Sequence, residues 1–339
     1  MKRNARGFTL TELIVTVTVL GVLTAVVAPL IGNYLSARES AYRERATLDN
    51  QRIATALLDF AATQTPRATL PLPYSGAGYT KTVFNPADNS VAGLALQQGL
   101  YGTGVSPAAI NDDGYQSKRV RVYQLVPGIQ HQVPLYYRSG PLVTLNYDYG
   151  VLYQTACQKL DASCNPRAVT GVPGDSPELK ATNLTTWDVA GEDYPATHLS
   201  TLPLQMAMLS ATAQRLDRIR DKLISHLRDH QVTANAGDET NWFPGTGSGG
   251  KDPLLTQGCR DGWYSLVTSN VLPTLGVAPE EYGVTAWGGA IEYCRDYDAD
   301  GSGLPNKPPH YAALRVNRSL SLGVVPDPAL PAANIVLTF

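Results

Sequence analysis

The sequence predicts an α+β fold in which a long N-terminal helix packs on an antiparallel sheet and a second α+β lobe follows. Three observations predict it: an apolar run over residues 8–31, short apolar stretches punctuated by Gly and Pro over 63–203, and an amphipathic segment over 205–230. With 43% hydrophobic and 17% charged residues, the chain has the composition of a folded protein.

The N-terminal helix is expected over residues 8–62, ended by Pro66. Its apolar part, residues 8–31, exceeds the roughly 30 Å hydrocarbon core of a bilayer at about 1.5 Å per residue. The residues before it include the basic Lys2, Arg3 and Arg6, which favour a cytoplasmic start. No Ala-x-Ala cleavage site follows directly behind the run, so we expect a retained single-pass inner-membrane anchor rather than a secretory signal.

The second half of this helix is expected to be amphipathic. Its apolar stripe consists of Ala46, Ile53, Leu57 and Phe60. Their spacings of seven, four and three residues place them on one helical face. Pro29, which lacks a backbone N–H, should kink or locally melt the helix. A helix end at Pro29 is the simpler alternative, but the stripe beyond it argues against that end.

Glu12 is a carboxylate inside the apolar run. Such a group costs several kcal/mol in a bilayer unless it is neutralised or paired, so it indicates a function. A lone Glu near a helix end could also protonate or reach the interface. Here it stands in the segment Gly7-Phe8-Thr9-Leu10-Thr11-Glu12, which resembles the prepilin signature of type IV pilins and pseudopilins. In that family Gly precedes the cut, Phe is the first mature residue, and Glu is the fifth.

The resemblance covers residues 1–60 and implies a processing route. A prepilin peptidase would remove the leader 1–7 after Gly7, and the new Phe8 amine would be N-methylated. The resemblance also implies other pilin subunits and an inner-membrane assembly platform as partners, and a periplasmic or extracellular filament as destination. Within a filament, Glu12 of one subunit could pair with the Phe8 ammonium of a neighbour and set the axial register, because a buried charge is tolerable only when paired. Pro29 lies where many pilins carry a helix-bending proline.

The sequence after the N-terminal helix predicts two lobes. We expect a first pilin-like lobe over residues 63–202 and a second over 203–339, whose amphipathic helix spans 205–230 and has no membrane half. The apolar face of that helix carries Leu209, Leu216, Ile219, Leu223 and Leu227. A single α+β domain with one internal helix is the alternative.

The stretch from Ala286 to Tyr293 is similar to a Trp-containing stretch of major pseudopilins of type II secretion. Thr285 and Ala286 stand where that family has Asp-Pro, and Ala290 replaces a later Pro, so the match is loose.

Four cysteines occur, at Cys157, Cys164, Cys259 and Cys294. They show no metal or redox spacing, and an even count in an exported chain favours disulfides. Of the three pairings we favour Cys157 with Cys164 and Cys259 with Cys294; reduced core thiols are the alternative.

One acidic segment is a candidate calcium site. Its ligands would be Asp296, Asp298, Asp300 and Ser302, an alternating pattern before Gly that resembles the start of an EF-hand loop. The twelfth position is Lys307 rather than Glu, which excludes a true EF-hand. Major pseudopilins similarly carry calcium in a C-terminal loop. An acidic surface turn is the alternative to a structural calcium site. We expect no required cofactor.

The function expected is that of a structural filament subunit without a catalytic site, since no Gly-x-Ser-x-Gly elbow or ranked triad is found. The size of the chain favours a minor or tip subunit over a repeated shaft subunit. Alternatives are a type II secretion pseudopilin and a pilin-stemmed adhesin or DNA receptor. Lys118, Arg119 and Arg121 could serve DNA. We expect them instead on the solvent-exposed face of a strand. We expect no nucleic-acid partner, since the formal net charge is −2.

Overall fold

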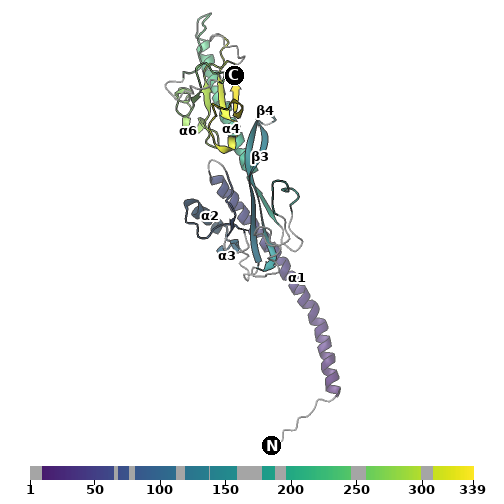
Figure 1. The fold of residues 1–339 in the computed structure, drawn as a ribbon. Helices are drawn as coiled ribbons and strands as arrows, with labels where there is room; N and C mark the ends of the chain where they lie inside the picture. The colour runs from purple at the N-terminus through teal and green to yellow at the C-terminus, as the bar shows by residue number, and fades with distance from the viewer. Residues whose placement is uncertain are drawn as a thin grey trace.

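The computed structural model describes residues 10–64, 68–75, 81–111, 119–136, 138–158, 178–187, 196–245, 257–298 and 308–339. The molecule is elongated, with the N-terminal helix projecting from one end and the C-terminus near the other (Figure 1).

The helices are α1 (Leu10–Thr63), α2 (Val91–Gly102), α3 (Pro107–Asn111), α4 (Leu202–Gln231), α5 (Val271–Thr274) and α6 (Pro279–Tyr282), with 3-10 turns η2 (Leu320–Leu322) and η3 (Pro331–Ala333). The strands are β1 (Tyr74–Ser75), β2 (Lys81–Thr82), β3 (Arg119–Tyr136), β4 (Ser139–Gln158), β5 (Thr197–Ser200), β6 (Tyr264–Ser265), β7 (Glu292–Cys294), β8 (Ala313–Asn317) and β9 (Asn334–Thr338). They form antiparallel sheets of order β1-β2, β3-β4-β5 and β6-β7-β8-β9. The α+β class predicted from the sequence is confirmed.

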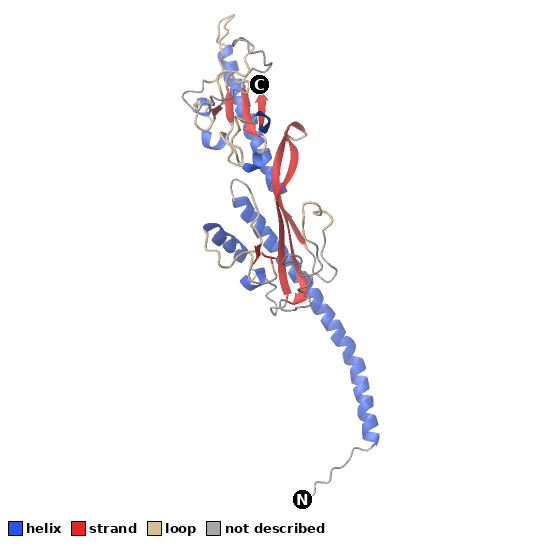
Figure 2. Cartoon of the chain, viewed as in Figure 1, coloured by secondary structure: helices blue, strands red, loops and turns tan. Residues whose placement is uncertain are grey.

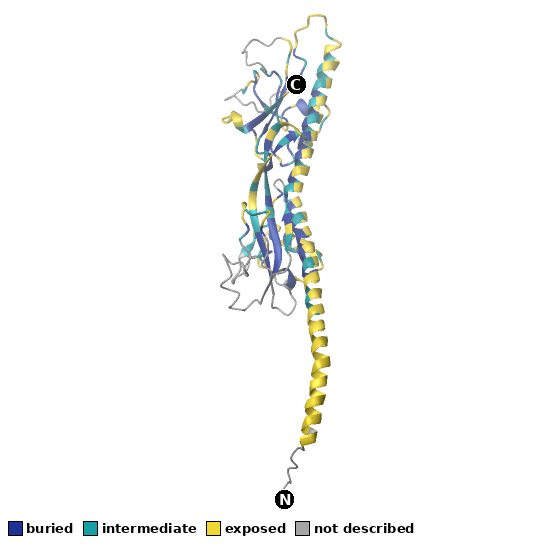
Figure 3. Ribbon diagram, turned by 90° about the vertical axis from the view of Figure 1, so that its right-hand side faces the viewer, coloured by how far each residue is buried: buried dark blue, intermediate teal, exposed yellow. Residues whose placement is uncertain are grey.

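Helix α1 runs unbroken through Pro29, so the proline neither ends the helix nor melts a turn of it. The first half of α1 is gently curved and lies clear of the rest of the chain (Figure 3). In the second half, Ala46, Ile53 and Leu57 of the predicted stripe are buried and Phe60 packs partly buried beside them. Their core partners come from α2 and from the start of the β3–β4 hairpin. The sequence period therefore identified the packed face correctly.

The β3–β4 hairpin contributes to the cores of both lobes. Near its base, Tyr123 and Leu152 join the α1 core, while Val122 and Val151 point to the other face and pack against Trp187. This alternation follows from the two-residue period of a strand. Figure 2 shows the same hairpin continuing from the lobe around α1 to the lobe around α4.

At its distal half the hairpin packs on α4 and on the β6-β7-β8-β9 sheet. Four of its side chains lie in that core: Val133, Leu135, Val143 and Leu145. Burial, and then the Asp217 carboxylate on α4, raise the pKa of Tyr136 to about 12. Residues that we placed in the first lobe from sequence thus complete the core of the second.

A bulge divides the two halves of the hairpin. Val126 pairs with Tyr149 and Ile129 with Tyr147, which leaves Pro127 and Gly128 opposite Asp148. Gly128 has a φ of 67°, a conformation that glycine adopts without strain. Bulges of this kind bend a strand and increase its twist, so this one marks the point where the hairpin passes from one lobe to the other.

Asp148 connects the bulge to two other segments. Its Oδ1 accepts from the Gly128 N–H at 2.9 Å, and its Oδ2 accepts from the Leu70 N–H at 2.8 Å. Its own N–H donates to Thr201 Oγ1 at 2.8 Å, one residue before α4. The residue is 4% exposed, and burial together with the Asp148 charge raises the pKa of the nearby Tyr123.

The second lobe repeats the plan of a helix on an antiparallel sheet. Of the predicted face of α4, Leu209, Leu216, Ile219 and Leu223 are buried and Leu227 is partly buried. The lobe is fastened to the hairpin by polar contacts: Thr144 N–H donates to Arg318 O at 3.1 Å, and Asn146 N–H donates to Ser321 Oγ at 2.7 Å. These contacts join segments more than 170 residues apart.

Replacing Asp148 by Asn should lower the free energy of unfolding by about 2–3 kcal/mol, because an amide nitrogen would then face a backbone N–H that loses its charged acceptor. Urea unfolding of the full chain in detergent, followed by tryptophan fluorescence, measures the change. Asp221→Asn on the exposed side of α4 is the control. If both variants lose the same small free energy of unfolding, the hydrogen bonds of the Asp148 carboxylate do not stabilise the bulge.

Candidate functional site

The exposed half of α1 is the first candidate site. Gly7 and Phe8 lie outside the described residues. Glu12 lies at the start of α1, and the structure describes its backbone but not its side chain. From Leu10 to Leu35 the large apolar side chains are all 42% exposed or more. Figure 3 shows this part of the helix as a continuous exposed rod.

Two threonines within this rod are hydrogen-bonded to the helix backbone. Thr18 Oγ1 donates to Ile14 O at 2.7 Å, and Thr24 Oγ1 donates to Leu20 O at 2.6 Å. A membrane span requires its polar groups to be paired internally. The helix is long and apolar enough to cross a membrane, and its most apolar window is 0% buried. It therefore fits a membrane anchor.

The Trp287 segment is held by α4. Trp287 Nε1 donates to Gln205 Oε1 at 2.7 Å, and the Ala286 N–H donates to Thr212 Oγ1 at 3.0 Å. Arg215 Nη1 adds a hydrogen bond of 2.9 Å to Val284 O. Because Trp287 is 0% exposed, this segment anchors the second lobe internally and offers no indole ring to a ligand.

The disulfide between Cys259 and Cys294 is present, as predicted, with a Cα–Cα distance of 5.8 Å. It joins the turn before β6 to the end of β7. The other predicted pair stays a prediction: the side chain of Cys157 and the whole of Cys164 lie outside the described residues.

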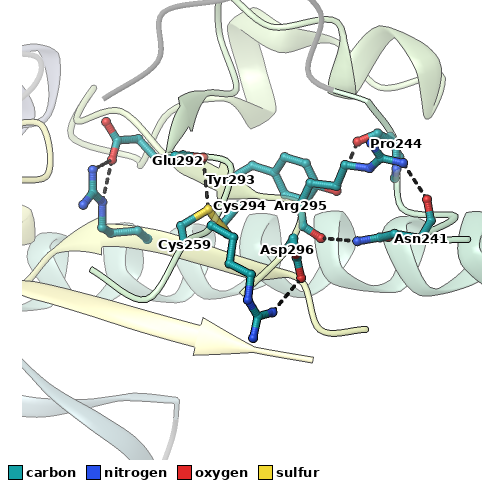
Figure 4. The surroundings of a disulfide bond; sticks show 11 residues. Asn241, Pro244, Cys259, Glu292, Tyr293, Cys294, Arg295 and Asp296 are labelled. Carbon is teal, nitrogen blue, oxygen red and sulfur yellow. Dashed lines mark hydrogen bonds and ion pairs between the residues drawn. A yellow bond between two sulfur atoms is a disulfide. The ribbon is translucent and has the colours of Figure 1, made fainter. Parts of the chain in front are cut away.

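The acidic candidate site lies directly beside this disulfide (Figure 4). Two of its predicted ligands are described, and both contact Arg260: Asp296 Oδ1 lies 3.0 Å from Nη1, and Asp298 Oδ1 lies 3.1 Å from Nη2. Asp300 and Ser302 lie outside the described residues. Arg260 was not identified from the sequence, because it lies 36 residues before Asp296 and belongs to no recognisable motif. Its adjacency to Cys259 was the signal that could have placed it here.

The backbone around the acidic pair, by which we mean Asp296 and Asp298, is closely packed. Gly258 has a φ of 81°, and a Cβ at that position would lie 2.8 Å from the Tyr297 ring. Burial, and then the charge of Asp298, raise the pKa of Tyr297. Glycine is therefore needed here both for conformation and for the approach of the ring.

A fully buried guanidinium lies in the same lobe. Arg315 Nε donates to Glu292 Oε2 at 2.7 Å, and the guanidinium carbon lies 4.6 Å from the centre of the Trp263 ring. The 0% exposed Arg315 side chain thus has both an anionic and an aromatic neighbour.

Arg121 does not lie where the sequence placed it. We expected it on the wet face of a strand, but its side chain is 0% exposed and Nε donates to Asn50 Oδ1 of α1 at 2.7 Å. The reason is that both faces of β3 are covered at this point, one by α1 and the other by the segment around Trp187. Arg121 is therefore unavailable to DNA. Lys118 lies outside the described residues, as does the side chain of Arg119.

Among the residues that the structure describes, no group of three or more His, Cys, Asp or Glu side chains is placed to hold a metal ion. The described geometry consists of a membrane-compatible helix and two lobes joined by internal polar contacts.

Comparison with known proteins bears on the N-terminus. The model of the prokaryotic N-terminal methylation motif matches residues 2–28, which include Gly7, Phe8 and Glu12. No curated protein and no solved structure matches the chain. The chain thus carries the prepilin-type signature of type IV pilins and pseudopilins.

Proposed function

We propose that this chain is a structural subunit of a type IV pilus or related filament, and that it is a minor or tip subunit. The observation that carries the proposal is the continuity of α1. One helix begins with the methylation motif, exposes an apolar half, and then enters the core of a folded head. An exposed apolar surface of this extent requires a membrane or other apolar helices around it.

The arrangement of the lobes supports a place at the filament end. The lobe around α4 lies at the opposite end of the molecule from the N-terminus (Figure 1). With α1 in the filament axis, this lobe would extend beyond the first, where a repeated subunit would have to accommodate a neighbour. The processed chain would start in the inner membrane, meet the assembly platform there, and enter the filament after cleavage.

A type II secretion pseudopilin is the second candidate, favoured by the segment around Trp287. Its buried indole and its hydrogen bond to Gln205 give that segment a role in the lobe core. A surface adhesin is supported by the exposed distal lobe alone. The DNA-receptor alternative is weakened, because Arg121 of the basic patch is buried.

The placement is tested by immunogold electron microscopy of sheared surface filaments with antibody against residues 203–339. We expect one label at one filament end, because the distal lobe would obstruct continuous stacking. Label repeated along the filament would make the chain a shaft subunit. Protein that stays in the inner membrane, with filaments unlabelled, would favour the secretion pseudopilin.

Replacing Gly7 by Leu should prevent processing, because a bulky side chain would stand directly before the scissile bond. Mass spectrometry of the purified protein is expected to show the uncut precursor for this variant and an N-methylated Phe8 terminus for the natural chain. Gly21→Ala is the matched control, since an added Cβ there meets nothing within 4 Å. Processing of the Gly7→Leu chain would show that the cut lies elsewhere.

Replacing Glu12 by Gln should leave processing intact and lower the amount of protein in sheared filaments by about tenfold or more, because the Phe8 ammonium of a neighbour would be buried without its partner. Immunoblots of filament and membrane fractions measure the ratio. Glu39→Gln, which removes an exposed carboxylate 3.7 Å from Arg43 on the same helix, is the control. Equal incorporation of both variants would remove Glu12 from the assembly contact.

A further inference from the structure

The acidic pair already has a cation beside it. The Arg260 guanidinium directs one terminal nitrogen to each carboxylate, with N–O distances of 3.0 Å to Asp296 and 3.1 Å to Asp298. The side chains are largely withdrawn from water: the exposed fractions are 27% for Arg260, 3% for Asp296 and 11% for Asp298. Figure 4 shows Asp296 close to the disulfide of Cys259 and Cys294.

This arrangement does not fit calcium ligation by the same oxygens. Calcium takes six to eight oxygen ligands at about 2.3–2.6 Å, whereas the facing oxygens of the acidic pair lie at hydrogen-bond distance from a guanidinium. A calcium ion bound to those oxygens would also stand next to a permanent positive charge. Arginine stays charged at every physiological pH and presents its N–H groups in a rigid planar fork.

The backbone holds Arg260 in this place. The Arg260 N–H donates to Asp296 O at 3.0 Å, and the Asp298 N–H donates to Gly258 O at 2.7 Å. Cys259 and Tyr297 form a β-bridge between these contacts, and the disulfide of Cys259 to Cys294 adds a covalent link. The guanidinium and the carboxylates therefore come from two segments that are fixed against each other on both sides of the ion pairs.

We propose that Arg260 takes the place of a metal ion at the acidic pair. It neutralises Asp296 and Asp298 in the region where the resemblance to pseudopilins implied calcium. The second lobe therefore folds and stays folded in calcium-free conditions. Calcium reaches the acidic pair only when the guanidinium is removed.

The test compares thermal unfolding of the full chain in detergent, with 2 mM CaCl2 or with EGTA, by intrinsic tryptophan fluorescence; Trp263 and Trp287 report on this lobe. The natural chain is expected to have the same Tm in both buffers. Arg260→Gln should lower the Tm in EGTA by roughly 5–10 °C, because two carboxylates that are 3% and 11% exposed lose the guanidinium beside them. Calcium should restore part of that loss in this variant alone.

Arg220→Gln is the matched control, because its guanidinium also joins two carboxylates, Asp217 at 2.9 Å and Asp221 at 3.0 Å, but is 41% exposed. It should change the Tm little and show no calcium response. If Arg260→Gln does not fold, the triple variant with Asp296→Asn and Asp298→Asn should recover folding, since the two carboxylate charges that faced the guanidinium are then also removed. A calcium-dependent Tm in the natural chain, an Arg260→Gln Tm equal to that of the control, or a triple variant no better than the single one would overturn the proposal.

Discussion

The β3–β4 hairpin is the element on which the rest of the head depends, because its side chains complete two cores. Tyr123 and Leu152 belong to the α1 core, whereas Val133 and Val143 belong to the α4 core. Separating the lobes would expose the distal half of the hairpin, at a cost of about 25 cal/mol per Å² of apolar surface. The bulge at Asp148 lies between these halves and fixes the register of both. The two lobes therefore form a continuous body rather than two domains on a linker.

Helix α1 belongs to this body only in its second half. From Ala46 onward its apolar stripe lies in the core, while before Leu35 its apolar side chains have no partner among the described residues. The stability of the head thus does not depend on what surrounds the first half. A subunit built in this way can exchange a lipid environment for an environment of neighbouring helices without refolding its lobes, since only the solvent of the exposed half changes.

Local patterns in the sequence predicted the elements that depend on local periodicity. The helices expected over 8–62 and 205–230 are observed as Leu10–Thr63 and Leu202–Gln231, and the pair Cys259–Cys294 was chosen correctly. Contacts that depend on distant segments were not predictable. Alternation in β3 placed Arg121 in water because it cannot show that both faces of a strand are covered. The roles of Asp148 and Arg260 arise from register and from chain crossing, which no short window of sequence contains.

Three arginines of the head, two of them fully buried and Arg260 27% exposed, contact polar partners from other segments. Arg121 donates a hydrogen bond to the neutral Asn50, whereas Arg315 forms an ion pair with Glu292 and Arg260 forms ion pairs with the acidic pair. A buried ion pair adds little net stability over apolar packing, but removing one partner is expensive. Such pairs therefore select one arrangement of the segments more than they strengthen it. In the second lobe, β6 and β7 are only two and three residues long, so their pairing supplies only part of that selection. The disulfide and the guanidinium groups that neutralise carboxylates inside the chain supply another part.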